Sequence, residues 1–432
     1  MLLEIRALDV EQALRLSLEG DLAFKGQRTN YSTHSVHAFA AKFPPQLPKT
    51  FIESLTLPGD TILDPMVGSG TAILEGALLG RKAIGIDIDP LALQISQAKT
   101  CPTEPEEALL YAEAIADWAR SAIAEPTIFR LEERFLERYG ESARRFFSYW
   151  FKEPTIRELS SLVQGMENVA PAKLRPFFEV VFSSIIVTKS GGVSRARDLA
   201  HSRPHLDTSK PVANAIDAFW ERARRIAAAV ASLPKDMPRP LIVAADCRLL
   251  PVRPTSIDLI VTSPPYVNAI DYVRAHKFSL IWLGYKPESL SRKRRQYIGA
   301  EVDRHSAISS PIAKTAIQAI ARTDQRRAKI VATYFTEMRI CLKEMLRVLR
   351  PAKAAIIVVG ASTIRGVKVK TALALAEIAE DLGFKVVGVQ PRPIDRDRRL
   401  MPISRDGNGQ GIEARIHEEH IIGLLKPKRD TS

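Results

Sequence analysis

The fold is decided by residues 61–89, TILDPMVGSGTAILEGALLGRKAIGIDID, in which two strands flank a glycine loop and a helix. The first strand, TILDP, is apolar and carries an acid near its end, and GTAILEGALLG is a helix that stops at Gly80. The second strand is KAIGIDID. Strand, glycine loop, helix and strand in this order predict the opening of a doubly wound α/β sheet.

Three zones organise the chain. Residues 1–100 hold this opening, residues 101–238 show helical apolar spacing, and residues 239–432 resume the strands. The pattern at the end of the last zone, helix, strand FKVVGVQ, loop and strand HIIGLLK, predicts a reversed strand at the edge of the sheet. We therefore expect a doubly wound, mostly parallel, Rossmann-like sheet with a large helical insertion at residues 101–238.

The composition indicates a globular protein with a polyanionic partner. The formal net charge is +13 over 432 residues, and a basic balance of this size favours nucleic acid. No apolar run is long enough to cross a bilayer, and the charged N-terminus does not read as a secretory signal. The three scattered cysteines suggest no disulfide framework and no metal site, so we expect a cytoplasmic protein.

The glycine loop and the acids around it favour a cationic nucleoside ligand. Gly68 and Gly70 allow a tight turn close to a ligand, and Asp87, roughly 20 residues on, suits the two hydroxyls of a ribose. A nicotinamide dehydrogenase would fit these residues equally well. However, position 73 is Ile where the dinucleotide fingerprint has its third glycine. Asp64 would also repel a pyrophosphate, whereas it would support the ammonium and sulfonium of S-adenosylmethionine.

The segment Thr262-Ser-Pro-Pro-Tyr266 has the chemistry of an amine-binding corner. Its two prolines stiffen the chain and remove two backbone donors, which leaves carbonyl groups unpaired. Ser263 Oγ and the Pro264 carbonyl are therefore candidate acceptors for an exocyclic amino group, and Tyr266 is a candidate to stack on the base that carries it. Two fixed acceptors would direct the nitrogen lone pair toward a methyl sulfonium by position and electrostatics.

With these residues the chain resembles the bacterial and archaeal DNA amino-methyltransferases, which methylate adenine N6 or cytosine N4. The resemblance depends on four blocks in order, HAFAAKFPPQL, DPMVGSGT, GIDIDP and TSPPY, and it covers about half of the chain. It implies S-adenosylmethionine as cofactor, DNA as partner and a cognate restriction endonuclease as a second partner. None of the three cysteines follows a proline, so the Pro-Cys pair of a C5-cytosine enzyme is absent.

The resemblance also assigns roles to individual residues. It places the DPMVGSGT residues at the methionine end of the cofactor, Lys42 and Phe43 over it, Asp87 at the ribose and Asp246 at the adenine amino group. The implied cofactor-binding residues are Lys42, Phe43, Asp64, Pro65, Gly68, Gly70, Thr71, Asp87, Ile88 and Asp246. The implied catalytic residues are Ser263, Pro264, Pro265 and Tyr266.

The first residue of the catalytic block bears on the target base. Adenine enzymes usually carry Asp or Asn there, so Ser263 favours cytosine N4 over adenine N6. The glycine loop precedes TSPPY, however, and the permuted order of many cytosine N4 enzymes is therefore absent. Two other classes stay open, an RNA or protein amide methyltransferase with the same cofactor loop and a nucleic-acid binder without turnover.

Two basic stretches are candidates for contacts with DNA phosphates. One lies in the turn-rich link of the insertion and the other follows TSPPY, within residues 267–335, a candidate segment for target recognition. The candidate nucleic-acid-binding residues are Arg195, Arg197, Arg292, Lys293, Arg294 and Arg295. The nearby aromatic run at residues 146–151 is better explained as packing core than as a base-stacking surface.

Overall fold

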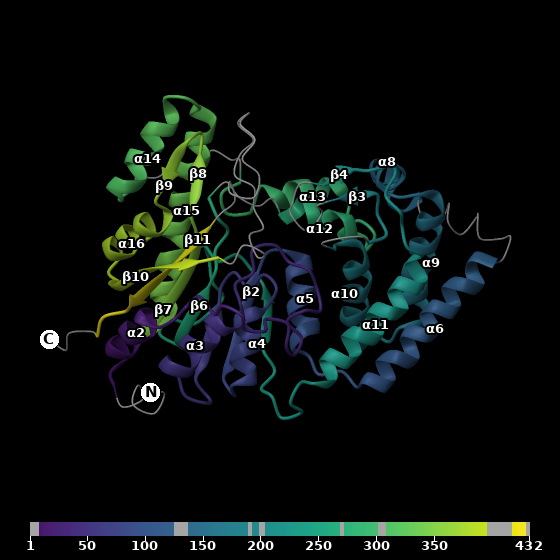
Figure 1. Ribbon diagram of the computed structural model, residues 1–432, viewed down its shortest axis with the longest axis horizontal. Coiled ribbons are helices and arrows are strands. Elements are labelled where there is room, and N and C mark those ends of the chain that lie inside the picture. Colours follow the sequence, from purple (N-terminus) through teal and green to yellow (C-terminus); the bar gives the residue numbers. More distant parts are fainter. Residues whose placement is uncertain are drawn as a thin grey trace.

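The computed structural model describes residues 8–124, 137–188, 192–197, 204–267, 272–300, 308–394 and 417–428. Within these residues seven strands form one sheet in the order β10-β11-β7-β6-β1-β2-β5 (Figure 1). In chain order the strands are β1 (Thr61–Asp64), β2 (Lys82–Asp87), β5 (Leu241–Ala244), β6 (Ile257–Thr262), β7 (Leu349–Gly360), β10 (Lys385–Pro393) and β11 (Glu418–Leu425).

The strand directions confirm a mostly parallel sheet and correct the place of its reversed strand. β1 pairs in parallel with β2 and β6, β2 pairs in parallel with β5, and β6 pairs in parallel with β7. β11 is antiparallel to both of its neighbours, β7 and β10. The reversed strand was expected at the edge of the sheet, but it lies one position inside, because β10 takes the edge and β11 returns between it and β7.

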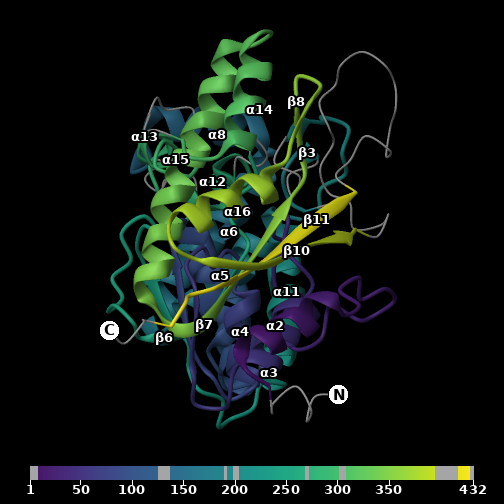
Figure 2. The ribbon, with the colours of Figure 1, turned by 90° about the vertical axis from the view of Figure 1, so that its left-hand side faces the viewer.

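Apolar side chains on both faces explain why the central strands are buried. Along β6, Leu259 and Val261 join one core cluster and Ile260 joins another, as expected when successive side chains point to opposite faces. The helices α2, α3 and α4 (Thr71–Leu78) pack on the first face and three others pack on the second (Figure 2). Besides α4, these helices are α2 (Val10–Glu19), α3 (Gln46–Leu55), α14 (Pro311–Ala321), α15 (Gln325–Val348) and α16 (Thr371–Asp381).

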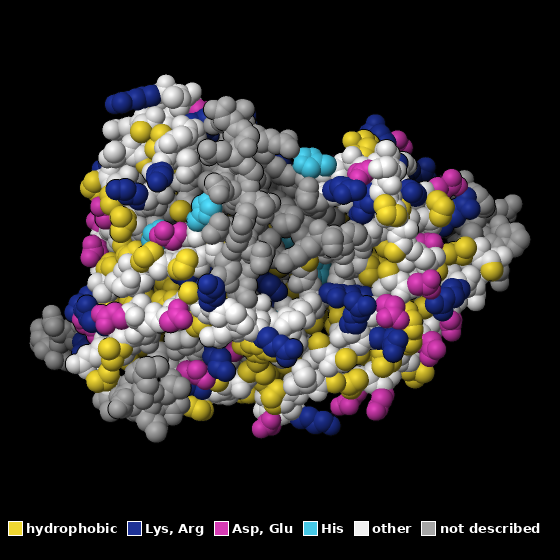
Figure 3. All heavy atoms as spheres, viewed as in Figure 1, with side chains coloured by type: hydrophobic (Ala, Val, Ile, Leu, Met, Phe, Trp, Pro, Cys, Tyr) yellow, Lys and Arg dark blue, Asp and Glu magenta, His cyan; other side chains and the backbone are white. Residues whose placement is uncertain are grey.

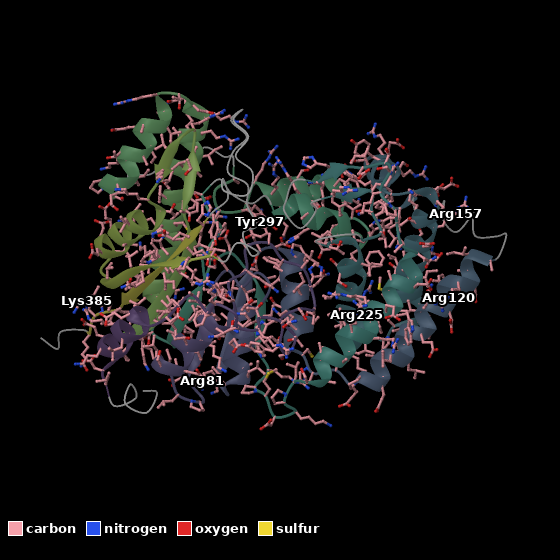
Figure 4. The ribbon with its side chains drawn as sticks, viewed as in Figure 1. Arg81, Arg120, Arg157, Arg225, Tyr297 and Lys385 are labelled. Atoms are coloured by element: carbon pink, nitrogen blue, oxygen red, sulfur yellow. The ribbon has the colours of Figure 1, made fainter. Side chains whose placement is uncertain are left out.

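A large helical insertion separates β2 from β5, as the sequence predicts. Two helices that belong to the sheet domain, α4 (Thr71–Leu78) and α5 (Pro90–Thr100), share one hydrophobic core with it. The helices of the insertion pack side by side at the right of Figure 1, where Figure 4 labels Arg120. An ion pair of 3.2 Å between Arg120 and Asp217 links two of these helices. They are α6 (Pro105–Ala124), α8 (Gly140–Trp150), α9 (Glu153–Val169), η1 (Ala172–Leu174), α10 (Arg175–Ile186) and α11 (Ala215–Ala231).

The remaining elements lie mainly above the sheet in the view of Figure 1. Two short helices, α12 and α13, follow β6, and a small hairpin, β8–β9, contacts α14. The short elements are β3 (Ala196–Arg197), β4 (His205–Leu206), α12 (Tyr272–Leu280), α13 (Pro287–Arg294), β8 (Ser362–Ile364) and β9 (Val367–Val369). Among the described residues, no helix combines the length and the apolar character that a membrane crossing would require.

Candidate active site

The glycine loop turns tightly between β1 and α4, as predicted. Gly68 and Gly70 both have positive φ values, +48° and +75°, which side chains other than glycine rarely adopt. A Cβ atom at Gly70 would also lie 2.9 Å from Ser96 Oγ and 3.1 Å from Ser96 Cα, in the neighbouring helix α5. Gly70 is therefore required both by its backbone conformation and by the close approach of α5.

Asp87, at the carboxyl end of β2, is tied directly to this loop. Its Oδ2 accepts the backbone N–H of Gly68 at 2.9 Å, and its Oδ1 accepts the backbone N–H of Asp89 at the same distance. Burial raises the pKa of Asp87 to about 6, because a charged carboxylate loses hydration there. The predicted ribose acceptor and the predicted glycine loop thus form one hydrogen-bonded unit.

Asp64 links the glycine loop to the Ser-Pro-Pro-Tyr corner. Its Oδ1 accepts the hydroxyl of Thr262 at 2.7 Å and the backbone N–H of Met66 at 3.2 Å. The link is possible because β1 and β6 are adjacent parallel strands, which end at the same edge of the sheet. Burial raises the pKa of Asp64 to about 7.

One cavity brings most of the predicted site residues together. It opens where β1, β2 and β6 end, between the glycine loop and the corner. Of the residues expected to bind cofactor or to act in catalysis, those that line it are Lys42, Phe43, Asp64, Pro65, Gly68, Thr71, Asp87, Ile88, Asp246, Ser263 and Pro265. Gly70, Pro264 and Tyr266 do not line this cavity, although they belong to the same two loops.

The segment before β1, residues 29–45, covers one side of the cavity. It is fastened to α4 by two hydrogen bonds of 2.7 Å, from the Tyr31 hydroxyl and from His34 Nε2, to the buried carboxylate of Glu75. The Lys42 ammonium donates to the His34 carbonyl at 2.6 Å. Lys42 is therefore held at the cavity wall by a contact within the protein, and Phe43 beside it is buried in the apolar core.

An aromatic wall that was not predicted from the sequence faces the glycine loop. The Phe39 ring would lie 3.2 Å from a Cβ atom at Gly68, and it stacks on Tyr272 with ring centroids 5.4 Å apart. His276 is tilted against Phe39 and places its Nδ1 2.6 Å from Asp89 Oδ2. Among these residues, Asp89 alone could have been found from the sequence. It stands before a proline in the GIDIDP block, where a helix cap is expected.

The residues that follow α13 form another wall of the cavity. Gln296, Tyr297 and Ile298 line it, and Figure 4 shows Tyr297 in the middle of the molecule. They directly follow the basic stretch at residues 292–295, in which Arg292 and Arg295 are exposed. A part of the candidate target-recognition segment 267–335 thus contributes to the cavity itself.

Some residues that were predicted to bind the cofactor or DNA also form hydrogen bonds or ion pairs within the protein. The half-exposed carboxylate of Asp246 lines the cavity but also pairs with Arg248, whose Nε lies 2.9 Å from its Oδ1. In the insertion, the Arg195 guanidinium donates to the Tyr149 carbonyl at 2.6 Å, and Arg197 forms an ion pair with Asp207. Arg195 and Arg197 are thus bonded to groups of the insertion, while residues 292–295 directly precede a wall of the cavity.

The thiols of Cys247 and Cys341 lie much closer than their sequence separation suggests. Cys247 lines the cavity, and its Sγ is 3.3 Å from the Sγ of Cys341 on α15, while both cysteines are free and buried. Cys341 lies in the buried core of α15. The aromatic run at residues 146–151 packs mainly as core, with Phe147 stacked on Trp282 at 3.9 Å, but the expectation is wrong for Tyr149, which is 53% exposed.

A second, larger cavity adjoins the first and shares Phe39, Lys42 and Phe43 with it. Its walls come from residues 29–45, the end of α10, one side of α11, and the strands β10 and β11. Tyr266 lines this cavity, and so does Arg225 on α11 (Figure 4). Lys and Arg side chains gather on the described surface beside the hollow in the middle of the molecule (Figure 3). The corner contributes Ser263 and Pro265 to the first cavity and Tyr266 to the second.

Comparisons with known proteins agree with this geometry. Residues 22–98 match a family model described as DNA methylase, N6_N4_Mtase. The chain is 27% identical to the type II methyltransferase M.MvaI of Kocuria varians, with 83% of each chain covered. It is 23% identical to the type II methyltransferase M.BsoBI of Geobacillus stearothermophilus, covering 83% of this chain and 80% of that one. A shorter match, 38% identical over 93 residues, is to the type II methyltransferase M.MjaII of Methanocaldococcus jannaschii.

Proposed function

This chain belongs to the S-adenosylmethionine-dependent DNA amino-methyltransferases, and we propose from that premise that it methylates the N4 amino group of cytosine. One observation carries the proposal: Ser263 and Pro265 line the same cavity as Gly68 and Asp87. A methyl donor held by the glycine loop would therefore face an amine held at the corner. If the glycine loop and the corner lined separate cavities, the methyl group could not reach the amine.

The donor set of the cavity fits S-adenosylmethionine. Four carboxylates line it, those of Asp64, Asp87, Asp89 and Asp246, which suits a ligand that carries an ammonium and a sulfonium and no phosphate. We assign Asp64 to the ammonium, Asp87 to the ribose hydroxyls, and Asp246 to the adenine amino group. The bound cofactor supplies an electrophilic methyl group on its sulfonium.

The protein's own part in the reaction is to hold the amine. In this proposal Ser263 Oγ and the Pro264 carbonyl accept the two N–H groups of the target, which directs the nitrogen lone pair toward the methyl donor. Ser263 is partly exposed in the cavity, while Thr262 just before it is fully buried and bonded to Asp64. The corner therefore already presents Ser263 to the cavity, whereas Pro264 does not line it.

The choice of cytosine follows from Ser263, which stands where adenine enzymes usually carry Asp or Asn. The test is to express the chain in a host without base modification and to sequence the genome for modified bases. We expect N4-methylcytosine in a fixed sequence motif. N6-methyladenine instead would overturn the choice of base, and unmodified DNA with methylated RNA would overturn the choice of substrate. A strain with Ser263→Ala serves as the control for background modification.

We propose further that DNA approaches through the larger cavity. Residues 292–295 could bind DNA phosphates, because they directly precede a wall of the first cavity. Arg225 could do the same, because it lines the second cavity. The insertion 101–238 and the segment 267–335 would then read the target sequence, since residues of the insertion line the larger cavity and residues of the segment line the smaller one. The type II names of the relatives also suggest a partner restriction endonuclease of the same specificity.

Cofactor binding is expected to depend on pH through Asp64. Burial raises the pKa of this carboxyl to about 7, so below pH 7 the unliganded protein holds it protonated. A cationic ammonium favours the ionised form, and binding must therefore release a proton. We expect the affinity for S-adenosylmethionine to fall by up to about tenfold for each pH unit below 7. Isothermal titration calorimetry from pH 5.5 to 8.5 measures both the affinity and the proton release.

The Asp64→Asn variant is the control for this dependence. It should bind more weakly and lose most of the pH dependence between pH 6 and 8, with a remainder below about pH 6 from Asp87, whose pKa is about 6. In the unliganded protein, the dependence of stability on pH has the opposite sign. Because the pKa of Asp64 is raised from its ordinary value of 3.8 to about 7, this residue lowers the free energy of unfolding as the pH rises from 3.8 to about 7. Constant wild-type affinity over the whole range would contradict the ammonium assignment.

A further inference from the structure

Three buried polar side chains meet behind the corner, at the wall of the larger cavity. The Tyr266 hydroxyl donates to Glu419 Oε1 at 2.7 Å, and Arg392 pairs with the other carboxylate oxygen. Arg392 also donates from Nε to the Leu22 carbonyl at 2.7 Å. Each of the three side chains belongs to a residue that is less than one tenth exposed.

The sheet register explains how these side chains come together. Arg392 on β10 is the direct partner of Glu419 on β11, and Glu419 is the direct partner of Gly360 on β7. A Cβ atom at Gly360 would lie 2.4 Å from Cε2 of Tyr266. The missing side chain at Gly360 therefore leaves the space that the tyrosine ring fills, beside the carboxylate that receives its hydroxyl.

The corner is thus held at both ends by buried carboxylates. At its start, Asp64 accepts the hydroxyl of Thr262, and at its end, Glu419 accepts the hydroxyl of Tyr266. The residues between these two bonds include Ser263 and Pro265, which line the cofactor cavity. A buried ion pair is costly to desolvate, and a hydrophobic group of the same volume often serves stability equally well. The Arg392–Glu419 pair lies at the end of the corner, which points to a role in positioning the corner.

We infer that Glu419 and Arg392 are positioning residues, which fix the catalytic corner through the Tyr266 hydroxyl. Arg392 pairs with Glu419, and Glu419 fixes the ring and with it the end of the corner. This inference rests on the proposed function, because it assumes that Ser263 and Pro264 hold the target amine. A loss of the hydroxyl bond would let the acceptors move relative to the methyl donor, and small misplacements of reacting groups reduce turnover strongly.

The experiment compares Tyr266→Phe with Tyr139→Phe. Tyr139 is an equally buried tyrosine whose hydroxyl donates at 2.7 Å to the Trp282 carbonyl, away from both cavities. Both substitutions remove one buried hydroxyl and keep the ring, so any stacking by Tyr266 survives. Methyl transfer from tritiated S-adenosylmethionine to DNA from a host without the protein gives kcat and KM, and calorimetry gives the Kd of the cofactor.

We expect Tyr266→Phe to lower kcat by about 10-fold to 100-fold with the cofactor Kd within about twofold, while Tyr139→Phe keeps the wild-type kcat. Glu419→Gln should lower kcat at least as much, and the double variant with Tyr266→Phe should be no slower than Glu419→Gln alone, because both changes break the same bond. If Glu419→Gln does not fold, the two tyrosine variants decide the question.

Three outcomes would overturn the inference: unchanged kcat in Tyr266→Phe, equal losses in the two tyrosine variants, or additive losses in the double variant. Failure of the proposed function is a separate result. In that case the wild-type protein itself would transfer no label to DNA, whatever the variants do.

Discussion

Replacing Asp87 by alanine is expected to weaken the binding of S-adenosylmethionine by at least about 100-fold. The substitution removes the proposed acceptor of two ribose hydroxyls, and a hydrogen bond to a charged group contributes about 1.5–3 kcal/mol, where 1.4 kcal/mol is a factor of ten. It also releases the Gly68 N–H, which Asp87 Oδ2 accepts at 2.9 Å. The glycine loop thus loses its anchor in the same step. Calorimetry with the purified variant measures the effect.

Asp60→Ala is the matched control, because Asp60 is also a partly exposed acid beside the same sheet. It lies at the amino end of β1, where its Oδ2 accepts the Leu57 N–H at 2.9 Å, on the opposite edge from the cavity. We expect wild-type cofactor affinity in this variant. Equal affinities in Asp87→Ala and the wild type would contradict the ribose assignment, and equal losses in both variants would show only a general weakening of the fold.

The site was predictable where its residues are close in sequence. Gly68, Gly70 and Asp87 stand within a single strand–loop–helix–strand unit, so their spacing alone places them at one edge of a sheet. The sequence also implies that the corner after β6 ends at this edge, because neighbouring parallel strands end together. What it could not show is the hydroxyl bond from Thr262 to Asp64, which joins residues 198 positions apart.

The walls of the site could not be predicted, since they come from segments without a local pattern. Phe39 and Tyr272 stack across a sequence separation that periodicity does not bridge. Residues 29–45 are held at the cavity because Glu75, an acid in the interior of a buried helix, accepts hydrogen bonds from Tyr31 and His34. From the sequence alone, Glu75 reads as one polar residue of an apolar helix, and nothing indicates its partners.

The order of the last strands shows a different limit. Alternating helices and strands predict that β10 and β11 belong to the sheet and that one of them is reversed, but they do not say which strand takes the edge. That position depends on pairing between distant strands: β11 joins β7 through a register that runs from Glu419–Gly360 to Leu425–Ala354. The same register brings Glu419 behind Tyr266, so the error in the predicted topology also concealed the contact between these two residues.

Ser263→Ala is expected to reduce kcat by about 100-fold to 1,000-fold, the cost of removing one fixed polar group that acts mainly in the transition state. The cofactor Kd should change by less than about twofold, since the Ser263 hydroxyl is assigned to the target amine. Ser256→Ala is the matched control. Ser256 stands just before β6 as Ser263 stands just after it, both are partly exposed, and the Ser256 hydroxyl donates to the Arg253 carbonyl at 2.7 Å.

These two serine variants separate chemistry from folding, because the same atom is removed at opposite ends of one strand. A loss of kcat in Ser263→Ala alone, at constant cofactor affinity, would place the hydroxyl at the reacting amine. If turnover survives in Ser263→Ala, the acceptors must be backbone carbonyls only, and the identity of the first residue of the corner could no longer bear on the choice between cytosine and adenine. The base assignment therefore depends on the same measurement as the catalytic one.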